Sequence, residues 1–184
     1  SYEKYGGYLP IYEKENAFTY FKEYDQIAIV DSDIWIRSGA PNIFEELTDE
    51  YDFGGMVESS APIVEWYRKK IINYSRMQYG SVKLNWQYDN NTGFPFMNMG
   101  LMLMNKSFAK HLKGQTPAQF IGRPEFKQIQ HENIPTKKLS WKWNALFTAL
   151  PDHKIKEAHF VHFFLKDKLP NRGENVRELM ERVQ

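Results

Sequence analysis

The sequence contains no cysteine, no hydrophobic run of membrane length and no excess of charge of one sign. The absence of cysteine excludes a disulfide framework, a thiolate zinc site and a cysteine nucleophile. No apolar run approaches the ~20 residues that cross a bilayer, and the N-terminus SYEKYGGY lacks the pattern of a signal peptide. The 24 basic and 23 acidic residues are interspersed, without the basic stripe of a nucleic-acid surface. We therefore expect a soluble, cytoplasmic protein that has no membrane span and binds no nucleic acid.

The chain is long enough for a single domain with its own core. Its 184 residues are 42% hydrophobic and 16% aromatic, a composition typical of a globular protein. Helix and strand patterns alternate along the sequence, and no internal repeat, low-complexity tract or linker separates them. This alternation predicts one α/β domain over residues 1–184.

Apolar periodicity and turn residues predict the individual elements. Strands are predicted at residues 8–13, 26–33, 53–57, 99–104 and 159–165. Helices are predicted at residues 16–24, at NIFEEL after Pro41, at 60–79, after Ser107, after Thr116 and around 176–183. In the longest helix Ser60 is the expected N-cap, Pro62 lies just inside the start and Gly80 follows the end. Its apolar residues keep close to the helical period, namely Ile63, Val64, Tyr67, Ile71, Tyr74 and Met77.

The segment QIAIVDSDIWI carries the strongest chemical signal. An apolar run ends in Asp31, Ser32 and Asp33, and successive strand side chains alternate faces, so the two acids are predicted to point the same way. Two acids at the carboxyl end of a buried strand lie where open α/β sheets bind ligands, and they can hold a divalent cation. Such a cation completes its shell with water and substrate phosphate, which indicates phosphate-bearing chemistry. The alternative is a strand end that simply meets solvent.

Two other segments carry candidate ligand contacts. Asn98 precedes Gly100, an amide beside a small residue that suits a polyhydroxyl ligand, although the amide could equally cap its own turn. His159 and His162 are three residues apart and face opposite sides of a strand, so only one can join a given site, and a buried structural histidine is the alternative. Lys168 follows near the strand end, where an ammonium group can hold phosphate.

The segment WKWN offers a third candidate. Trp141, Trp143 and Asn144 could form a platform on which a sugar stacks. Core packing of the two tryptophans is the interpretation that we favour, because large aromatic side chains at such spacing are usually buried.

Three segments, in this order, resemble the glycogenin-like family 8 branch of the GT-A-fold glycosyltransferases. YDQIAIVDSDIWI resembles the family's "YD-x-hydrophobic-D-x-D" segment, and NIFEEL resembles the helix that follows it. FPFMNMGLMLMN is similar to the "F-N-x-G" segment, and VHFFLKDKLP matches "H-F-x-G-x-x-K-P-W" in the spacing from His162 to Lys168. The resemblance covers roughly residues 16–170. It implies a GT-A-like α/β fold of the nucleotide-diphospho-sugar transferase type, a Rossmann-like mixed sheet flanked by helices.

The resemblance also implies an activity. It indicates a metal-dependent, hexosyltransferase-type enzyme that moves a sugar, with retention, from a nucleotide-sugar donor, UDP-linked, to a carbohydrate or other hydroxyl acceptor. By resemblance, Asp31, Asp33 and His162 bind the metal, Lys168 holds the diphosphate, and Asn98 with Gly100 contacts the donor sugar. An imidazole beside two carboxylates suits Mn2+, with Mg2+ as the alternative. The resemblance identifies no catalytic residue.

The sequence departs from the family at several positions. Leu165 stands where the family has glycine, and Leu169 with Pro170 replaces its closing Pro-Trp. The family's Asp-Gln pair has no counterpart that we assign, although Gln128, Gln130 and Glu132 lie in the right region. Only 30 residues precede Asp31, so we expect the family's first strand-helix unit to be missing. This predicts weak nucleoside-diphosphate binding with poor base discrimination, and self-association through an exposed edge.

Two other functions stay open. An Asp-nucleophile phosphohydrolase also begins with a strand and Asp-x-Asp, but that pattern wants Thr or Val two places after the second acid, where Trp35 stands. A nucleotide- or carbohydrate-binding domain without turnover is the other alternative. It remains open because the expected nucleotide pocket is incomplete.

Overall fold

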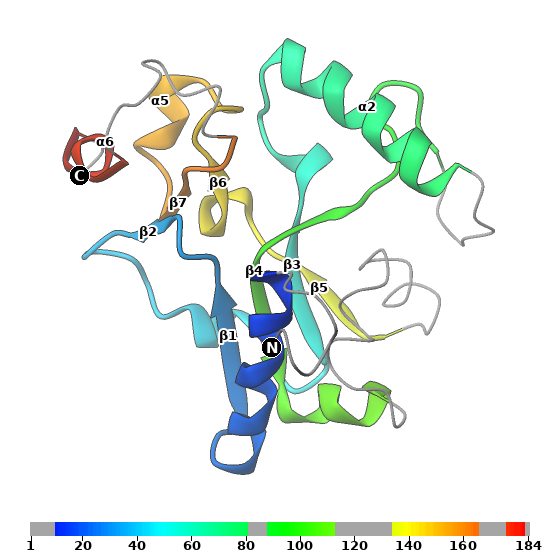
Figure 1. Ribbon diagram of the computed structural model, residues 1–184, viewed down its shortest axis with the longest axis vertical. Helices are drawn as coiled ribbons and strands as arrows, with labels where there is room; N and C mark the ends of the chain where they lie inside the picture. Colours follow the sequence, from blue (N-terminus) through cyan, green and yellow to red (C-terminus); the bar gives the residue numbers. More distant parts are fainter. Residues whose placement is uncertain (1–9, 81–87, 113–133, 166–175, 183–184) are drawn as a thin grey trace.

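The computed structural model describes residues 10–80, 88–112, 134–165 and 176–182 (Figure 1). The strands are β1 (Gln26–Val30), β2 (Ile34–Ile36), β3 (Phe53–Val57), β4 (Met97–Asn105), β5 (Thr136–Lys138), β6 (Ala145–Leu146) and β7 (Phe160–His162). The α-helices are α2 (Glu65–Tyr79), α5 (Asp152–Ile155) and α6 (Val176–Arg182). The 3-10 helices are η1 (Pro10–Lys22), η2 (Ile43–Glu46), η3 (Glu58–Ser60), η4 (Lys106–Leu112) and η5 (Trp141–Trp143).

The strands form two mixed sheets. The larger has the order β1-β4-β3-β5, in which β4 runs antiparallel to both neighbours and β3 runs parallel to β5. The smaller has the order β2-β7-β6, with β2 antiparallel and β6 parallel to β7. In Figure 1 the chain leaves the upper end of β1 and enters the small sheet at β2, so the β1-β2 connection lies where the two sheets meet. The predicted α/β class with a mixed sheet and flanking helices is confirmed.

The core lies on both faces of β4. Met102 and Met104 pack in one cluster with rings such as Phe53. Leu101 and Leu103, which alternate with them, pack in a second cluster around Trp143. Because both faces of this central strand are covered, its apolar run is continuous rather than alternating.

The N-terminal described segment is helical where a strand was predicted. The predicted strand at 8–13 is wrong from Pro10 onward, because η1 begins there and extends to Lys22, and it contains most of the helix predicted at 16–24. Phe18 and Phe21 are buried and three residues apart, so both fall on one face of a 3-10 helix, where residues repeat every third position. Phe18 stacks on Phe108, with ring centroids 6.1 Å apart. Burial of this aromatic face stabilises the part of η1 that was predicted as a helix.

Helix α2 begins later than predicted. Ser60 is not its N-cap but the last residue of η3, and its hydroxyl donates to the carbonyl of Val57, which precedes η3. Ala61, which precedes Pro62, has ψ 153°, the extended backbone that a following proline imposes. The helix therefore starts only at Glu65 and, as predicted, ends at the residue before Gly80.

The buried face of α2 also differs in its second half. Tyr67 and Ile71 are buried as predicted, but the next buried position is Ser75. Tyr74 is 46% exposed and Met77 is 80% exposed. The burial follows steps of four residues, because these positions lie above one another on a helix.

Other boundaries shift by a few residues. Strand β4 extends the predicted 99–104 at both ends, and β7 covers only part of the predicted 159–165. Helix η4 begins one residue before Ser107. The helix predicted after Thr116 and the last residue of the one predicted at 176–183 lie outside the described residues.

A buried carboxylate joins η4 to the start of β3. Asp52 accepts hydrogen bonds from the Ser107 hydroxyl and the Lys110 ammonium, and lies 2.5 Å from Nε2 of His111. Burial alone raises the pKa of Asp52, but the hydrogen bonds from Lys110, Ser107 and His111 outweigh it and lower the pKa to about 2. The carboxylate is therefore ionised at neutral pH and serves as a structural anchor.

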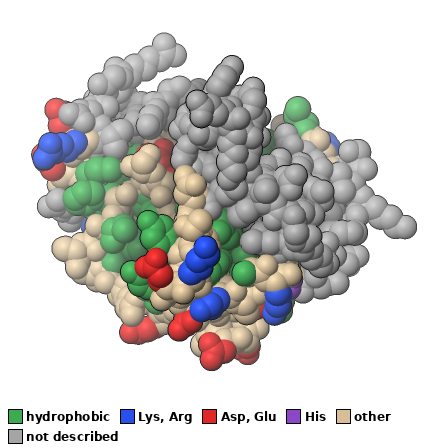
Figure 2. Space-filling view, turned by 60° about the horizontal axis from the view of Figure 1, so that its bottom comes forward, with side chains coloured by type: hydrophobic (Ala, Val, Ile, Leu, Met, Phe, Trp, Pro, Cys, Tyr) green, Lys and Arg blue, Asp and Glu red, His purple; other side chains and the backbone are tan. Residues whose placement is uncertain are grey.

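The described surface mixes charge with apolar side chains. On the face shown in Figure 2, acidic and basic side chains lie among hydrophobic ones. A shallow hollow beside β1 is lined by Tyr20, Tyr24 and Phe44, all of them exposed. None of the helices that the structure describes is both long and apolar enough to span a membrane.

Candidate metal site and ligand pocket

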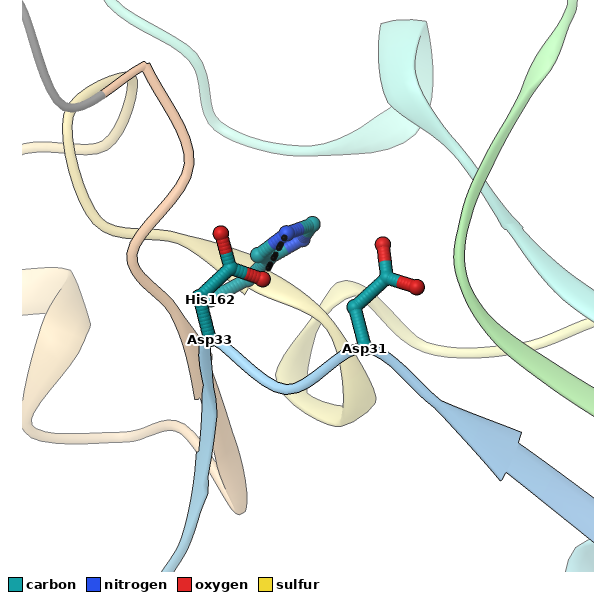
Figure 3. Close-up of side chains that lie close together, drawn as sticks. All are labelled: Asp31, Asp33 and His162. Atoms are coloured by element: carbon teal, nitrogen blue, oxygen red, sulfur yellow. Dashed lines mark ion pairs between the residues drawn. The ribbon is translucent and has the colours of Figure 1, made fainter. Parts of the chain in front are cut away.

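The two acids of QIAIVDSDIWI lie in a turn. Asp31 directly follows β1 and Asp33 directly precedes β2, and the N–H of Ile34 closes the turn on the carbonyl of Asp31 at 3.1 Å. The prediction that both acids belong to one extended strand is therefore wrong. They point the same way because the chain turns between them, and both carboxylates rise on one side of the turn (Figure 3).

Backbone hydrogen bonds from both sheets hold this turn. The N–H of Asp31 donates to the carbonyl of Gly100 in β4 at 2.8 Å. The carbonyl of Asp33 accepts from the N–H of Phe163, just after β7, also at 2.8 Å. The acids are therefore positioned by main-chain contacts that do not depend on their own side chains.

His162 completes a cluster with the two acids. It is the last residue of β7 and is only 4% exposed. Its Nε2 lies 3.3 Å from Oδ1 of Asp33. One ligand atom from each of Asp31, Asp33 and His162 lies within 4.8 Å of the other two. The structure thus brings together the three residues that the sequence nominated for a metal.

The other histidine of this segment faces elsewhere. The ring of His159 packs on Trp143, with centroids 4.6 Å apart, and Trp143 is buried in the second core cluster. Burial lowers the pKa of His159, and the charge of Lys142 lowers it further. Core packing, rather than a stacking platform, accounts for Trp143.

A lysine that the sequence analysis missed lies beside the acids. Nζ of Lys14 is 2.6 Å from Oδ1 of Asp31 and donates to the carbonyl of Met99 at 2.8 Å. Lys14 belongs to η1, and its residues were predicted as a strand and a separate helix, so the sequence contained no signal that could place it here. The ammonium orients one acid and adds positive charge to a site with two carboxylates.

Behind the cluster lies a hydrogen-bonded series of polar side chains, of which His162, Asn144 and Glu58 are buried and Asn98 is half-buried. Nδ1 of His162 is 2.9 Å from Oδ1 of Asn144, and Nδ2 of Asn144 donates to Oδ1 of Asn98 at 2.9 Å. The same Oδ1 of Asn98 accepts from the N–H of Gly100 at 2.9 Å, and Nδ2 of Asn98 donates to Glu58 at 2.8 Å. Asn98, predicted to contact a sugar, therefore uses its side chain within the protein as well.

Glu58 ends this series and is another residue that the sequence analysis missed. Its second carboxylate oxygen accepts from the Tyr67 hydroxyl at 2.6 Å. Burial raises the pKa of Glu58, against the hydrogen bonds from Tyr67 and Asn98, which lower it. A buried carboxyl group that meets an open pocket is a frequent feature of functional sites.

These residues surround a single pocket of about 800 Å³, here called the acid pocket. The polar lining is formed by Lys14, Asp31, Asp33, Glu58, Tyr67, Lys70, Asn98 and His162. Apolar side chains of α2 and of the segment before β4 form the other wall, including Ile71, Tyr74 and Phe96. Mixed polar and aromatic walls of this size suit a ligand with both charged and ring-shaped parts.

No protein-family model matches the sequence, and no curated protein matches it. Solved structures with a similar fold include three glycosyltransferases. The first is the bifunctional glycosyltransferase WbbM in its apo form, with TM-score 0.53 and 13% identity over 86% of this chain and 32% of that one. The second is galactosyltransferase LgtC in complex with donor and acceptor sugar analogues, with TM-score 0.52 and 14% identity over 99% and 71% of the two chains.

The third is a glycosyltransferase involved in glycosylation of the major capsid of PBCV-1. It has TM-score 0.50 and 18% identity, over 94% of this chain and 73% of that one. The fold is GT-A. At such identities the likeness carries the fold alone. The chain spans about a third of WbbM and under three quarters of the other two proteins.

One residue of this GT-A chain occupies a conformation that suits glycine. Leu165 has φ 54°, in the left-handed region. The segment that it belongs to resembles "H-F-x-G", and the position of that glycine is Leu165. A left-handed φ is costly for a bulky side chain, whereas glycine adopts it without that cost. Lys168 and the region of Gln128, Gln130 and Glu132 lie outside the described residues.

The donor set fits a divalent cation. Two carboxylates and one imidazole combine hard oxygen ligands with a nitrogen ligand, as Mn2+ accepts. Two of the three side chains have a fixed neighbour, since Asp31 pairs with Lys14 and Nδ1 of His162 lies against Asn144. A hydrogen-bond partner on the far nitrogen is a common feature of histidines that bind metal.

Proposed function

We propose that this GT-A domain transfers a sugar from a nucleoside-diphosphate-sugar donor, UDP-linked, to a carbohydrate or other hydroxyl acceptor, with retention. Asp31, Asp33 and His162 hold Mn2+, with Mg2+ as the alternative. The observation that carries the proposal is the convergence of these three ligands at the acid pocket of a GT-A fold. The LgtC structure, solved with donor and acceptor sugar analogues, supports a sugar as the ligand class.

The chemistry follows from charge. When the diphosphate leaves the sugar, negative charge develops on its oxygens, and a bound divalent cation neutralises it. Lys14 lies against Asp31 at the pocket wall, where its ammonium group would add positive charge for a bound diphosphate. Lys168 is proposed as a further diphosphate contact, and Asn98 with Gly100 as contacts of the donor sugar. The hexosyl class of the donor is part of the same proposal.

Titration calorimetry tests the proposal directly. We expect UDP to bind when Mn2+ is present and to bind much more weakly in chelator, because a cation held by Asp31, Asp33 and His162 would supply positive charge to the diphosphate. Incubation with UDP-sugars should then release UDP slowly, through transfer to acceptor or water. Binding without release would favour the non-catalytic alternative. Absence of Mn2+-dependent UDP binding would contradict the proposal altogether.

Replacing Lys14 should separate metal binding from diphosphate binding. In Lys14→Met we expect the affinity for UDP with Mn2+ to fall about tenfold, the effect of one charge-assisted hydrogen bond. Mn2+ affinity alone should not fall, since the ammonium competes with the cation for Asp31. Calorimetry of both ligands makes the comparison, with the exposed Lys69→Met on α2 as the control. A parallel loss of both affinities would show that Lys14 acts only by shaping the turn.

A further inference from the structure

We infer that Asn144 is a positioning residue that fixes the tautomer of His162, so that the imidazole presents an unprotonated Nε2 to the acids. Asn144 does not contact the acid pocket. The purpose that we assign to this tautomer, metal binding, rests on the proposed function, but the first test of the tautomer needs neither metal nor substrate. It follows from the hydrogen-bond polarity of the series behind the metal site.

A backbone group determines which atoms donate and which accept in this series of hydrogen bonds. The N–H of Gly100 can only donate, and it lies 2.9 Å from one terminal atom of the Asn98 side chain. That atom must therefore be the amide oxygen, Oδ1. The amide nitrogen of Asn98 then faces Glu58 at 2.8 Å, where it meets an oxygen acceptor. The contacts with Gly100 and with Glu58 therefore give the same orientation of the Asn98 amide.

The orientation of Asn98 determines that of Asn144. The terminal atom of Asn144 that lies 2.9 Å from Oδ1 of Asn98 has to donate, so it is Nδ2. Oδ1 of Asn144 consequently faces Nδ1 of His162 at 2.9 Å. Asn144 is fully buried, so no exposed surface lets its amide turn over toward solvent. An amide oxygen in this position requires a donor, and Nδ1 of His162 must carry a hydrogen.

The proton on Nδ1 decides the chemistry of the opposite nitrogen. A neutral imidazole has one N–H, so Nε2 keeps its lone pair. That nitrogen lies 3.3 Å from Oδ1 of Asp33, on the side of the ring that faces the acids. Lone pair and carboxylate then face each other across a space that suits a cation. Asn144 thus acts as the outer partner that a metal-bound histidine commonly has.

The tautomer can be observed by NMR. Long-range nitrogen-proton spectra of metal-free protein labelled with 15N-histidine distinguish the protonated from the unprotonated ring nitrogen. In its neutral form, the imidazole of His162 should show a protonated Nδ1 and an unprotonated Nε2. Observation of the Nε2–H tautomer in the native chain would overturn the inference, whatever the protein does with metal or sugar.

Three variants separate positioning from general stability. Asn144→Leu removes the acceptor, and we expect the Nε2–H tautomer together with Mn2+ affinity weakened by roughly 10- to 100-fold. Asn144→Asp keeps an acceptor oxygen, and the Nδ1–H tautomer should persist, with Mn2+ affinity retained to within a few fold. Asn105→Leu is the matched control, because Asn105 is also buried on a hydrogen-bond network, at the far end of β4. It should lose stability without changing tautomer or Mn2+ affinity.

The outcomes distinguish this inference from the proposed function. An Nδ1–H tautomer in a chain that binds no Mn2+ would support the positioning role and sink the metal-dependent function. An unchanged tautomer and unchanged Mn2+ affinity in Asn144→Leu would refute the positioning role while leaving the function intact. Should Asn144→Leu fail to fold, the native spectrum and the Asn144→Asp variant still decide the question.

Discussion

Replacing Asp33 with alanine should abolish Mn2+ binding while leaving the fold in place. The variant removes one of three ligands, and we expect the affinity for Mn2+ to fall roughly 100-fold or more, beyond the loss typical of outer partners. Stability should change by less than about 1 kcal/mol, because the side chain is partly exposed and the backbone contact with Phe163 remains. Calorimetry with Mn2+ and thermal denaturation measure the two quantities.

The matched control for this experiment is Asp49→Ala. Asp49 is an exposed acid in the loop before β3, remote in sequence from the metal ligands. The Asp49→Ala substitution removes the same charge from the chain, so it shows whether loss of one negative charge alone weakens Mn2+ binding. We expect native affinity in the control, and loss of Mn2+-dependent UDP binding only in Asp33→Ala. Native Mn2+ affinity in Asp33→Ala would remove Asp33 from the metal site.

The sequence predicted the cluster for a reason that turned out to be incomplete. Alternation along one strand was the argument for placing Asp31 and Asp33 on the same side. In the structure the strand ends before Asp31, and β2 belongs to another sheet. The acids still converge because a tight turn closed by Ile34 brings them to one side. Residues two apart share a side in both conformations, so the right pairing followed from the wrong local geometry.

Elements with strong local signals were the most predictable. The strand at 53–57 and the end of α2 at Gly80 agree with the structure. The start of α2 was misplaced because the proline signal was read as a helix opening, whereas Pro62 forces the preceding residue into an extended backbone. Most of the helix predicted at residues 16–24 lies within η1, whereas the start of η1 from Pro10 was predicted as a strand.

Outer partners of the site could not be predicted from local pattern. Glu58 lies in η3, Lys14 in η1 and Asn144 between η5 and β6, and none carries a motif that points to the acids. Their roles depend on which strands pair. Asn144 directly precedes β6, and β6 lies beside β7, so the amide meets His162 only once that parallel pairing has formed. Such contacts depend on tertiary structure, and local sequence patterns do not predict them.

Gly100→Ala is expected to disrupt the proposed metal site, because Gly100 lies directly against His162 and Asn98. A Cβ at this position would collide with Cε1 of His162, and it would lie 2.7 Å from Nδ1 of His162 and 2.9 Å from Oδ1 of Asn98. We therefore expect the imidazole or the backbone of β4 to shift, and a backbone shift would reach the turn at Asp31, because the Asp31 N–H donates to the Gly100 carbonyl. The glycine is needed here for close approach of a ring, where the sequence suggested close approach of a sugar.

Two effects should follow from Gly100→Ala, and two glycine controls separate them. Overpacking of this kind costs about 1–3 kcal/mol of stability, and displacement of His162 should reduce Mn2+ affinity by roughly 100-fold, as for a lost ligand. Gly39→Ala meets no atom within 4 Å and should be neutral in both measurements. In Gly54→Ala, in β3, the nearest atoms to the new Cβ are the flexible ends of Leu47 and Leu139, so this variant should lose stability without losing Mn2+ affinity. If Gly100→Ala behaves like Gly54→Ala, with lower stability but native Mn2+ affinity, then the His162 ring is not held where the structure places it and the cation takes other ligands.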